Sequence, residues 1–223
     1  MKHEFWNDRW RQGQIGFHLG QPHDWLVAAA GRFPAAARVY VPLCGKTVDL
    51  VWLRDQGHEV IGCEFVASAV HDFLREQNLA ARTEHRGEGD SRYACHRTPG
   101  LSVLQGDALN LDAAHLGGPV DVVFDRAALV ALDPACRRRY VDGLVRLLRP
   151  GGHILLIAFA YDQSRVDGPP WSVDADTIER LFGDRFSIET LAVRAEEGNP
   201  RFQAAGVPEM EERCCWLTLK DAS

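Results

Sequence analysis

From residue 38 onward, two patterns of apolar positions alternate along the chain. Short runs that are almost wholly apolar alternate with segments whose apolar residues recur every three or four positions, as they do on one side of a helix. The apolar runs predict five strands, over residues 38–43, 58–65, 100–109, 119–129 and 153–161. The helical segments lie between them, over residues 47–57, 67–79 and 134–152. Strands that are apolar throughout and separated by helices favour a parallel sheet with helices on both faces.

The last of these helices carries clear boundary signals, and the pattern changes after it. Pro134 suits a first helical turn, and Gly151 suits a helix end. Beyond Asp162 the sequence predicts a helix over 174–186 and two strands over 186–195 and 213–220. The connection between these two strands shows no clear helix, so we expect them to pair antiparallel at one sheet edge. The whole chain, residues 1–223, is then a single α/β domain with a mostly parallel seven-stranded sheet.

Two segments interrupt this regular pattern. Residues 1–24 are rich in aromatic side chains, among them Trp6, Trp10 and Phe17, with glycines between them. Such a segment either fastens the terminus to the core or covers a ligand as a lid. Residues 82–100 are charged and contain glycine, which indicates a surface loop or a short hairpin inserted between a helix and a strand.

Composition narrows the class of protein. The 223 residues carry a net charge of −6 and give a pI of about 5.8, and no basic patch favours nucleic acid. The six cysteines form no CxxC pair, so zinc-ribbon spacing is absent and we predict no metal. No apolar run approaches the roughly 18 residues that a membrane span needs. We therefore expect a cytoplasmic protein with reduced thiols and without nucleic-acid or membrane partners.

Polar residues follow the predicted strands at the edge where ligands bind in open parallel sheets. Gly45 follows the first strand, and Glu64 ends the second, 19 residues later. A carboxylate at that distance can hold a ribose diol, although it can equally be a surface charge at a strand end. Asp107 and Ala108 follow the third strand, where a second carboxylate could accept from a purine amine. Arg126 follows the fourth strand.

The glycine pattern does not fit a phosphate site. Gly45-Lys46-Thr47 looks like the end of a P-loop, but the first glycine of that motif is replaced by Tyr40, and Pro42 offers no N–H. The dinucleotide fingerprint G-x-G-x-x-G is also missing, which disfavours a nicotinamide-dependent reductase. The site suits a nucleoside whose remaining part is not a phosphate, and S-adenosylmethionine fits that description.

Three stretches resemble one family. "FWNDRWRQGQIGFH", "VPLCGKTVDLVWLRDQGHEVIGCE" and "FDRAALVAL" are similar to the thiopurine S-methyltransferases, and matching stretches run from about residue 5 to residue 184. The resemblance implies a Rossmann-like class I methyltransferase fold that uses S-adenosylmethionine and releases S-adenosylhomocysteine. By the same resemblance, the cofactor is contacted by Trp10, Leu43, Glu64 and Arg126. Gly45 is then the turn that lets the cofactor approach the first strand, and Lys46-Thr47 starts the helix.

The resemblance also implies an acceptor, but the C-terminal segment departs from the family. "NPRFQAAGVPEMEERCCWLTL" keeps the spacing from Arg201 to Gly206 and lacks the family's Ser-Trp. The predicted reaction is methylation of thiopurines or other small aromatic or heterocyclic thiols, and of selenium or tellurium species. Arg126 and Arg201 would steady the anionic nucleophile, Trp6, Trp10 and Phe17 would form the lid, and the protein would be a monomer. The alternative is a sensor or scaffold that binds the cofactor without turnover.

Overall fold

The computed structural model describes residues 3–89 and 92–221. The chain divides into two compact units, Lys2–Val123 and Phe124–Ser223, called here the N-terminal unit and the C-terminal unit. Each unit is described by itself. The first two residues of the predicted lid and residues 90–91 of the predicted insertion lie outside the described residues.

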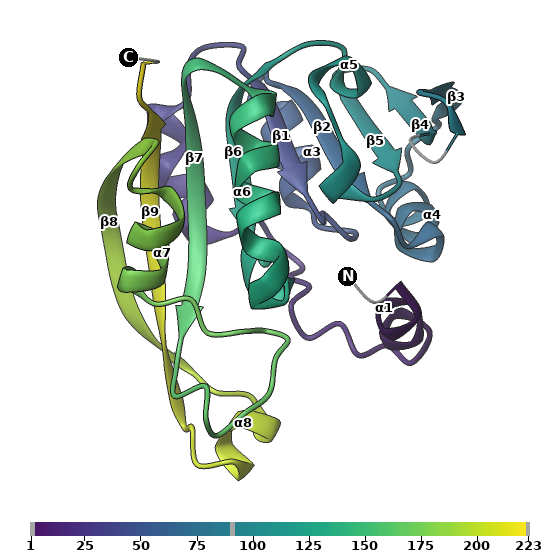
Figure 1. Ribbon diagram of the computed structural model, residues 1–223. Helices are drawn as coiled ribbons and strands as arrows, with labels where there is room; N and C mark the ends of the chain where they lie inside the picture. The colour runs from purple at the N-terminus through teal and green to yellow at the C-terminus, as the bar shows by residue number, and fades with distance from the viewer. Residues whose placement is uncertain (1–2, 90–91, 222–223) are drawn as a thin grey trace. The chain divides into compact units, whose positions relative to one another are not determined.

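The N-terminal unit is built on a mixed sheet with a parallel centre (Figure 1). Its strands are β1 (Arg38–Pro42), β2 (Glu59–Glu64), β3 (Arg82–Arg86), β4 (Tyr93–Thr98), β5 (Leu101–Gln105) and the first residues of β6 (Val120–Arg126). They lie in the order β3-β4-β5-β2-β1-β6. β1 is parallel to β2 and β6, and β2 is parallel to β5. β3 and β4 form an antiparallel hairpin, and β4 pairs antiparallel with β5.

Five helices and two 3-10 turns of this unit lie within the described residues. They are α1 (His3–Arg11), α2 (Asp24–Ala29), α3 (Asp49–Asp55), α4 (Ala67–Glu76) and α5 (Ala113–Leu116), with short 3-10 turns η1 (Ala30–Arg32) and η3 (Ala108–Asn110). α3 and α4 contact β2 and β5. In α4 the residues Ala69, Val70 and Phe73 recur at helical spacing and are fully buried, which is why this amphipathic segment is a helix.

In the C-terminal unit, two long strands, β9 and β8, follow β7 in the sheet. Its elements are η4 (Leu129–Ala131), α6 (Pro134–Leu147), β7 (Leu148–Ala160), α7 (Ala175–Phe182), β8 (Phe186–Glu197), α8 (Pro200–Ala204) and β9 (Glu209–Leu219). β9 lies between β7 and β8 and is antiparallel to both. α6 contacts β7 and α7, as Figure 1 shows in green. The predicted antiparallel pair at a sheet edge is confirmed.

The mostly parallel α/β fold is as predicted, but the strand count is not. The described residues contain nine strands rather than seven, because residues 82–98 form the β3–β4 hairpin and join the sheet. The composition of this segment predicted either a surface loop or a short hairpin, and the structure has the hairpin.

Two helix boundaries also differ from the prediction. α6 ends at Leu147, well before Gly151, which lies within β7 with a φ of +68°. Pro150 explains the early end, because a proline disfavours helical backbone at the residue before it, here Arg149. α3 begins at Asp49, so Lys46-Thr47 precede the helix rather than start it. Within the described residues, every helix is too short or too polar to cross a membrane.

Candidate cofactor and acceptor residues

Glu64 is a buried carboxylate at the end of β2. Its side chain is only 6% exposed, and its two oxygens accept the backbone N–H groups of Gly45 at 3.0 Å and Val66 at 2.7 Å. Burial raises the pKa of the Glu64 carboxyl, and these backbone hydrogen bonds lower it again in part. Each carboxylate oxygen can accept a second hydrogen bond. The group is therefore held rigidly and keeps acceptor capacity for a ligand.

Gly45 forms the turn between β1 and α3 and lies under an aromatic cluster. Its φ of +53° is left-handed, which glycine adopts without strain. A β-carbon at Gly45 would come within 3.0 Å of Cζ2 of Trp10 and 3.8 Å of Cε2 of Phe17. Phe17 packs edge-on against both Trp10 and Trp6, with ring centroids 6.0 Å apart in each pair. The predicted lid residues thus gather over the glycine turn, on α1 and the segment that follows it.

Leu43 shows backbone strain two residues before Gly45. Its φ is +46°, in a region that residues with a side chain seldom enter and that costs of order 1–3 kcal/mol. Strain of this kind collects where a ligand site needs a particular backbone path. The outlier coincides with a residue predicted to contact the cofactor, which the sequence pattern alone does not reveal.

Asp107 and Ala108 follow β5 in a turn that several hydrogen bonds to other parts of the protein hold in place. Gly106 N–H donates to the carbonyl of Glu64 at 3.0 Å, so this turn adjoins the Glu64 carboxylate. The Asp107 carboxylate accepts Leu109 N–H at 2.9 Å and caps the short helix η3. Its other oxygen accepts Nδ2–H of Asn110 at 3.5 Å. Each oxygen of a carboxylate can accept a second hydrogen bond.

Tyr93 of β4 contacts this turn, and no sequence motif marks it as a site residue. It begins β4 in the hairpin, is 2% exposed, and its hydroxyl donates to the carbonyl of Asp107 at 2.8 Å. The only sequence signal is a single aromatic residue in an otherwise charged segment.

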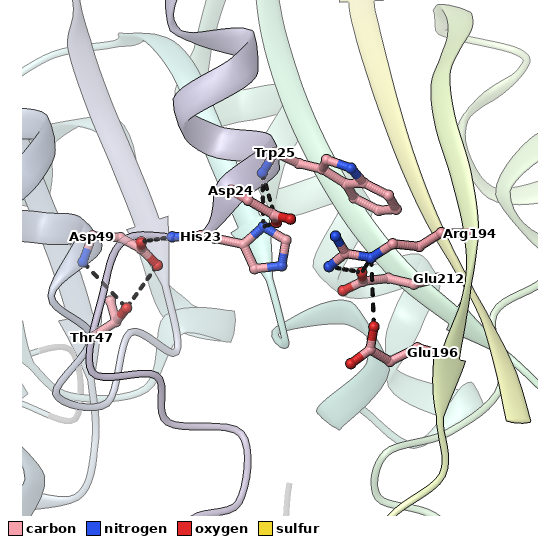
Figure 2. A network of polar contacts seen from close by, with 8 residues as sticks. All are labelled: His23, Asp24, Trp25, Thr47, Asp49, Arg194, Glu196 and Glu212. Carbon is pink, nitrogen blue, oxygen red and sulfur yellow. Dashed lines mark hydrogen bonds and ion pairs between the residues drawn. The ribbon is translucent and has the colours of Figure 1, made fainter. Parts of the chain in front are cut away.

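A second polar network fixes the end of the N-terminal segment to the start of α3. The buried Asp49 carboxylate accepts His23 N–H at 2.8 Å and the hydroxyl of Thr47 at 2.7 Å, as Figure 2 shows. Thr47 therefore bonds within the protein, where a P-loop threonine would hold a metal ion beside a phosphate. Lys46 is likewise occupied, by Glu76 of α4 at 2.8 Å.

The C-terminal unit holds the two predicted catalytic arginines. Arg126 ends β6, is partly buried, and is followed by Ala127 in the left-handed region with a φ of +61°. The neighbouring Asp125 is fully buried, and its carboxylate accepts Leu129 N–H at 3.0 Å and the hydroxyl of Tyr140 at 2.8 Å. Burial raises the pKa of Asp125 to about 6.

Arg201 lies on α8, where it is exposed and bound to a loop. Its guanidinium donates to the carbonyl of Pro169 at 3.2 Å and to the carbonyl of Asp167. Asn199 caps the same helix by accepting Arg201 N–H at 3.0 Å. These contacts connect α8 to residues 162–172. Arg201 therefore stabilises this loop, in addition to the catalytic role predicted for it.

Figure 2 also draws three charged residues of the C-terminal unit, Arg194, Glu196 and Glu212. Arg194 of β8 pairs with the buried Glu212 of β9 at 2.6 Å and lies 3.5 Å from Glu196. Across residues 3–89 and 92–221, no three His, Cys, Asp or Glu side chains are grouped so that they could hold a metal ion.

Known proteins are similar to this chain over its full length. The family model described as thiopurine S-methyltransferase matches residues 1–220. The thiopurine S-methyltransferase of Methylococcus capsulatus is 42% identical over 220 residues, which cover 97% of both chains. That of Nitrosospira multiformis is 40% identical over 227 residues, which cover 100% of both.

Solved structures share the fold at much lower identity. The 1,6-didemethyltoxoflavin-N1-methyltransferase of Burkholderia thailandensis, whose crystal structure contains S-adenosylhomocysteine, has a TM-score of 0.63 at 15% identity, covering 98% of this chain and 87% of that one. The N-methyltransferase NodS of Bradyrhizobium japonicum has a TM-score of 0.59 at 13% identity, covering 96% and 88%. These likenesses show a Rossmann-like methyltransferase fold.

Proposed function

Because the chain belongs to the thiopurine S-methyltransferase family, we propose that it transfers the methyl group of S-adenosylmethionine to the sulfur of a small aromatic or heterocyclic thiol. Thiopurines are one such class of acceptor. Reduced selenium and tellurium species are further candidates, because their nucleophilic atoms are soft and polarisable as thiolate sulfur is. The observation that carries the proposal is the buried Glu64 carboxylate, which the glycine turn and the end of β2 hold in place.

The residues present fit the cofactor. Glu64 accepts the backbone N–H groups of Gly45, Val66 and Phe65, and a carboxylate has about four lone-pair sites, so it would still have capacity for a ribose hydroxyl. The Asp107 carboxylate and the N–H of Ala108 would face the purine amine and ring. Trp10, Leu43 and Gly45 would line the rest of the cofactor site. The glycine-rich loop that binds phosphate in dinucleotide folds is absent from this sequence. A neutral nucleoside linked to an amino acid matches this set better than a dinucleotide does.

The cofactor supplies an electrophilic methyl group on a sulfonium, so the protein need not form a covalent intermediate. The chain's task is to align the acceptor sulfur in line with that methyl and to exclude water, which can lower the barrier by several kcal/mol. Trp6, Trp10 and Phe17 would exclude water as a lid. Arg126 would stabilise the thiolate form of the acceptor by its positive charge, with Arg201 as a second cation.

The proposal is tested with a panel of thiols assayed for release of S-adenosylhomocysteine. Thiopurines, benzenethiol, hydrogen selenide and an alcohol of matching shape cover the acceptor classes. Turnover with the thiols and none with the alcohol is expected. Binding of S-adenosylhomocysteine without turnover on any acceptor would instead support a cofactor-binding sensor or scaffold.

The proposed enzyme is a monomer of the cytoplasm. All six cysteines, which lie within the described residues, carry free thiols, and five are buried. Light scattering across a concentration series gives the oligomeric state, and fractionation of the producing cell gives the compartment.

A further inference from the structure

Tyr93 brings the β3–β4 hairpin to the edge of the proposed purine site. The hairpin is mostly charged and partly exposed, yet Tyr93 is 2% exposed and faces the turn after β5. Its ring packs edge-on against His115 at 4.8 Å between centroids. His115 is itself fixed by a capping box with Asp112 at the start of α5. The Tyr93 ring therefore has a packing partner besides the turn.

The Tyr93 ring determines which residue can stand at position 106. A β-carbon at Gly106 would lie 2.2 Å from Cδ1 and 2.4 Å from Cε1 of Tyr93, which no side chain can occupy. Gly106 has an ordinary φ, so the requirement comes from the ring and not from backbone strain. Ring and turn are thus in direct contact at the residue whose N–H bonds to Glu64.

The Tyr93 hydroxyl helps to fix a peptide plane at the proposed purine contact. It donates to the carbonyl oxygen of Asp107 at 2.8 Å, and Asn110 N–H of η3 donates to the same oxygen at 3.0 Å. In a trans peptide the C=O and the following N–H point in opposite directions. Holding the Asp107 carbonyl on the hairpin side therefore turns Ala108 N–H to the other side. Within residues 3–89 and 92–221, no protein acceptor receives this N–H.

The hydroxyl is a donor across the whole working range of pH. Burial raises the pKa of Tyr93 well above that of a free tyrosine, with smaller contributions from Cys63 and Asp107. Two neighbouring groups of the turn, Gly106 N–H and the Asp107 carboxylate, also have partners in the protein. Gly106 N–H donates to Glu64, and Asp107 accepts Leu109 N–H on its side chain. Ala108 N–H is the donor that this arrangement leaves for a ligand.

We propose that Tyr93 is a positioning residue: through the Asp107 carbonyl it aims Ala108 N–H at a ring nitrogen of the purine, so the hairpin helps to select adenine. This inference rests on the proposed function, since it assigns a further residue to the same cofactor. Tyr93 does not touch the reacting atoms. The acceptor that matches an N–H donor next to the amine-binding Asp107 is N1 of adenine, which adjoins the exocyclic amine. Hypoxanthine carries a proton at N1 and would present a donor to a donor.

The experiment compares S-adenosylhomocysteine with its 1-deaza and 3-deaza analogues by calorimetry, in the wild type and in Tyr93→Phe. The 1-deaza analogue lacks only the N1 acceptor. The wild type is expected to bind it roughly two- to tenfold more weakly than the parent, the range of one hydrogen bond. Tyr93→Phe keeps the ring and loses the hydroxyl while Asn110 N–H still bonds to the Asp107 carbonyl, so its parent-to-1-deaza ratio should fall below the wild-type ratio. The parent-to-3-deaza ratio should stay at the wild-type value.

Thr83→Val is the matched control. It removes one hydrogen bond of the same hairpin, between the Thr83 hydroxyl and Nδ1 of His96 at 3.1 Å, without touching the turn. All ratios in this variant should equal those of the wild type. A Tyr93→Phe protein that weakens every analogue by one common factor, or that keeps the wild-type 1-deaza penalty, would show that Tyr93 is only structural.

A measurement on the wild type needs no variant to fold. The amide proton of Ala108 should move downfield on binding S-adenosylhomocysteine and should move much less with the 1-deaza analogue. Equal shifts with both ligands would overturn the inference. A wild type that binds none of the three ligands would instead remove the proposed function, so the two failures are distinguishable.

Discussion

The carboxylate of Glu64, at the end of β2, accepts the N–H of Gly45, in the turn after β1, at 3.0 Å. One hydrogen bond therefore joins the two strand ends at which the proposed ribose and methionine parts of the cofactor would lie. Glu64→Ala removes the acceptors for the ribose hydroxyls, and S-adenosylmethionine affinity should fall by about 1.5–3 kcal/mol, the range for hydrogen bonds to a charged group. Calorimetry on the folded variant measures this, and unchanged affinity would contradict the assignment.

Glu64→Gln is the control for this prediction, because Glu64 also supports the protein's own turn. Glutamine keeps one acceptor oxygen, so it should retain more of the affinity than alanine does. The wild type should also lose affinity as pH falls through the pKa of Glu64, since a protonated carboxyl has less acceptor capacity. Burial raises that pKa, so the loss should begin at a higher pH than for an exposed glutamate.

The second prediction concerns the aromatic lid. Trp10 lies on the Gly45 turn and Phe17 packs on Trp10, so a bound cofactor at that turn would add contacts to both rings. Amides of residues 3–24 should exchange hydrogen faster in the free protein than with S-adenosylhomocysteine, because Gly13, Gly16 and Gly20 weaken the helical structure there. Equal protection in both states would mean that the aromatic residues simply belong to the core. Amides of the buried helix α4 provide the internal control.

The third prediction uses the pH dependence of Asp125. Its folded-state pKa of about 6 lies above the ordinary 3.8, so the native state binds the proton more tightly than the unfolded chain. Its contribution to stability is therefore greatest below about pH 4 and is lost as pH rises through 6, by about 3 kcal/mol in total. Asp125→Asn carries no such charge and can still accept Leu129 N–H. The unfolding free energy of Asp125→Asn minus that of the wild type should rise between pH 4 and pH 7. A flat difference in urea denaturation would contradict the raised pKa.

The fold was predictable where hydrophobic periodicity is strong, and the misses have local physical causes. The central strands and α3, α4, α6 and α7 follow from apolar runs and helical spacing. The β3–β4 hairpin was ambiguous, because its charged sequence is typical of a loop and only pairing with β5 makes it part of the sheet. Helices α1 and α8 were missed because tertiary contacts and the Asn199 cap, rather than a long amphipathic pattern, define them.

In the candidate site, too, some residues could be predicted from the sequence pattern, and others depend on packing that the sequence does not show. Glu64 and Asp107 follow from their positions after strands, since topology alone brings the carboxyl ends of parallel strands to one edge. Tyr93 could not be found in that way, because it comes from an antiparallel strand whose register no motif encodes. The strain at Leu43 is equally invisible, since leucine has no sequence preference for a left-handed φ.

The last prediction concerns Arg126, which either activates the acceptor thiol by its positive charge or only holds the cofactor. The neighbouring Asp125 carboxylate accepts Leu129 N–H and the hydroxyl of Tyr140. A guanidinium at the end of β6 can lower the pKa of an acceptor thiol by charge proximity. Arg126→Met removes the charge at similar length, and Arg126→Lys keeps the charge while losing the planar fork.

If the charge of Arg126 activates the acceptor, Arg126→Met should slow methylation most for thiols of high intrinsic pKa, and raising the pH should partly restore the rate. A thiol that is already ionised should be affected less, and Arg126→Lys should lie between Met and the wild type. Arg180→Met, which removes an exposed arginine of α7, controls for the loss of one positive charge and should leave the pH profile unchanged. The measurement is the rate of S-adenosylhomocysteine release against pH for thiols that span a range of pKa, with cofactor affinity measured in parallel. An equal loss for every acceptor at every pH, matched by an equal loss of cofactor affinity, would show that Arg126 holds the cofactor and has no part in activating the acceptor.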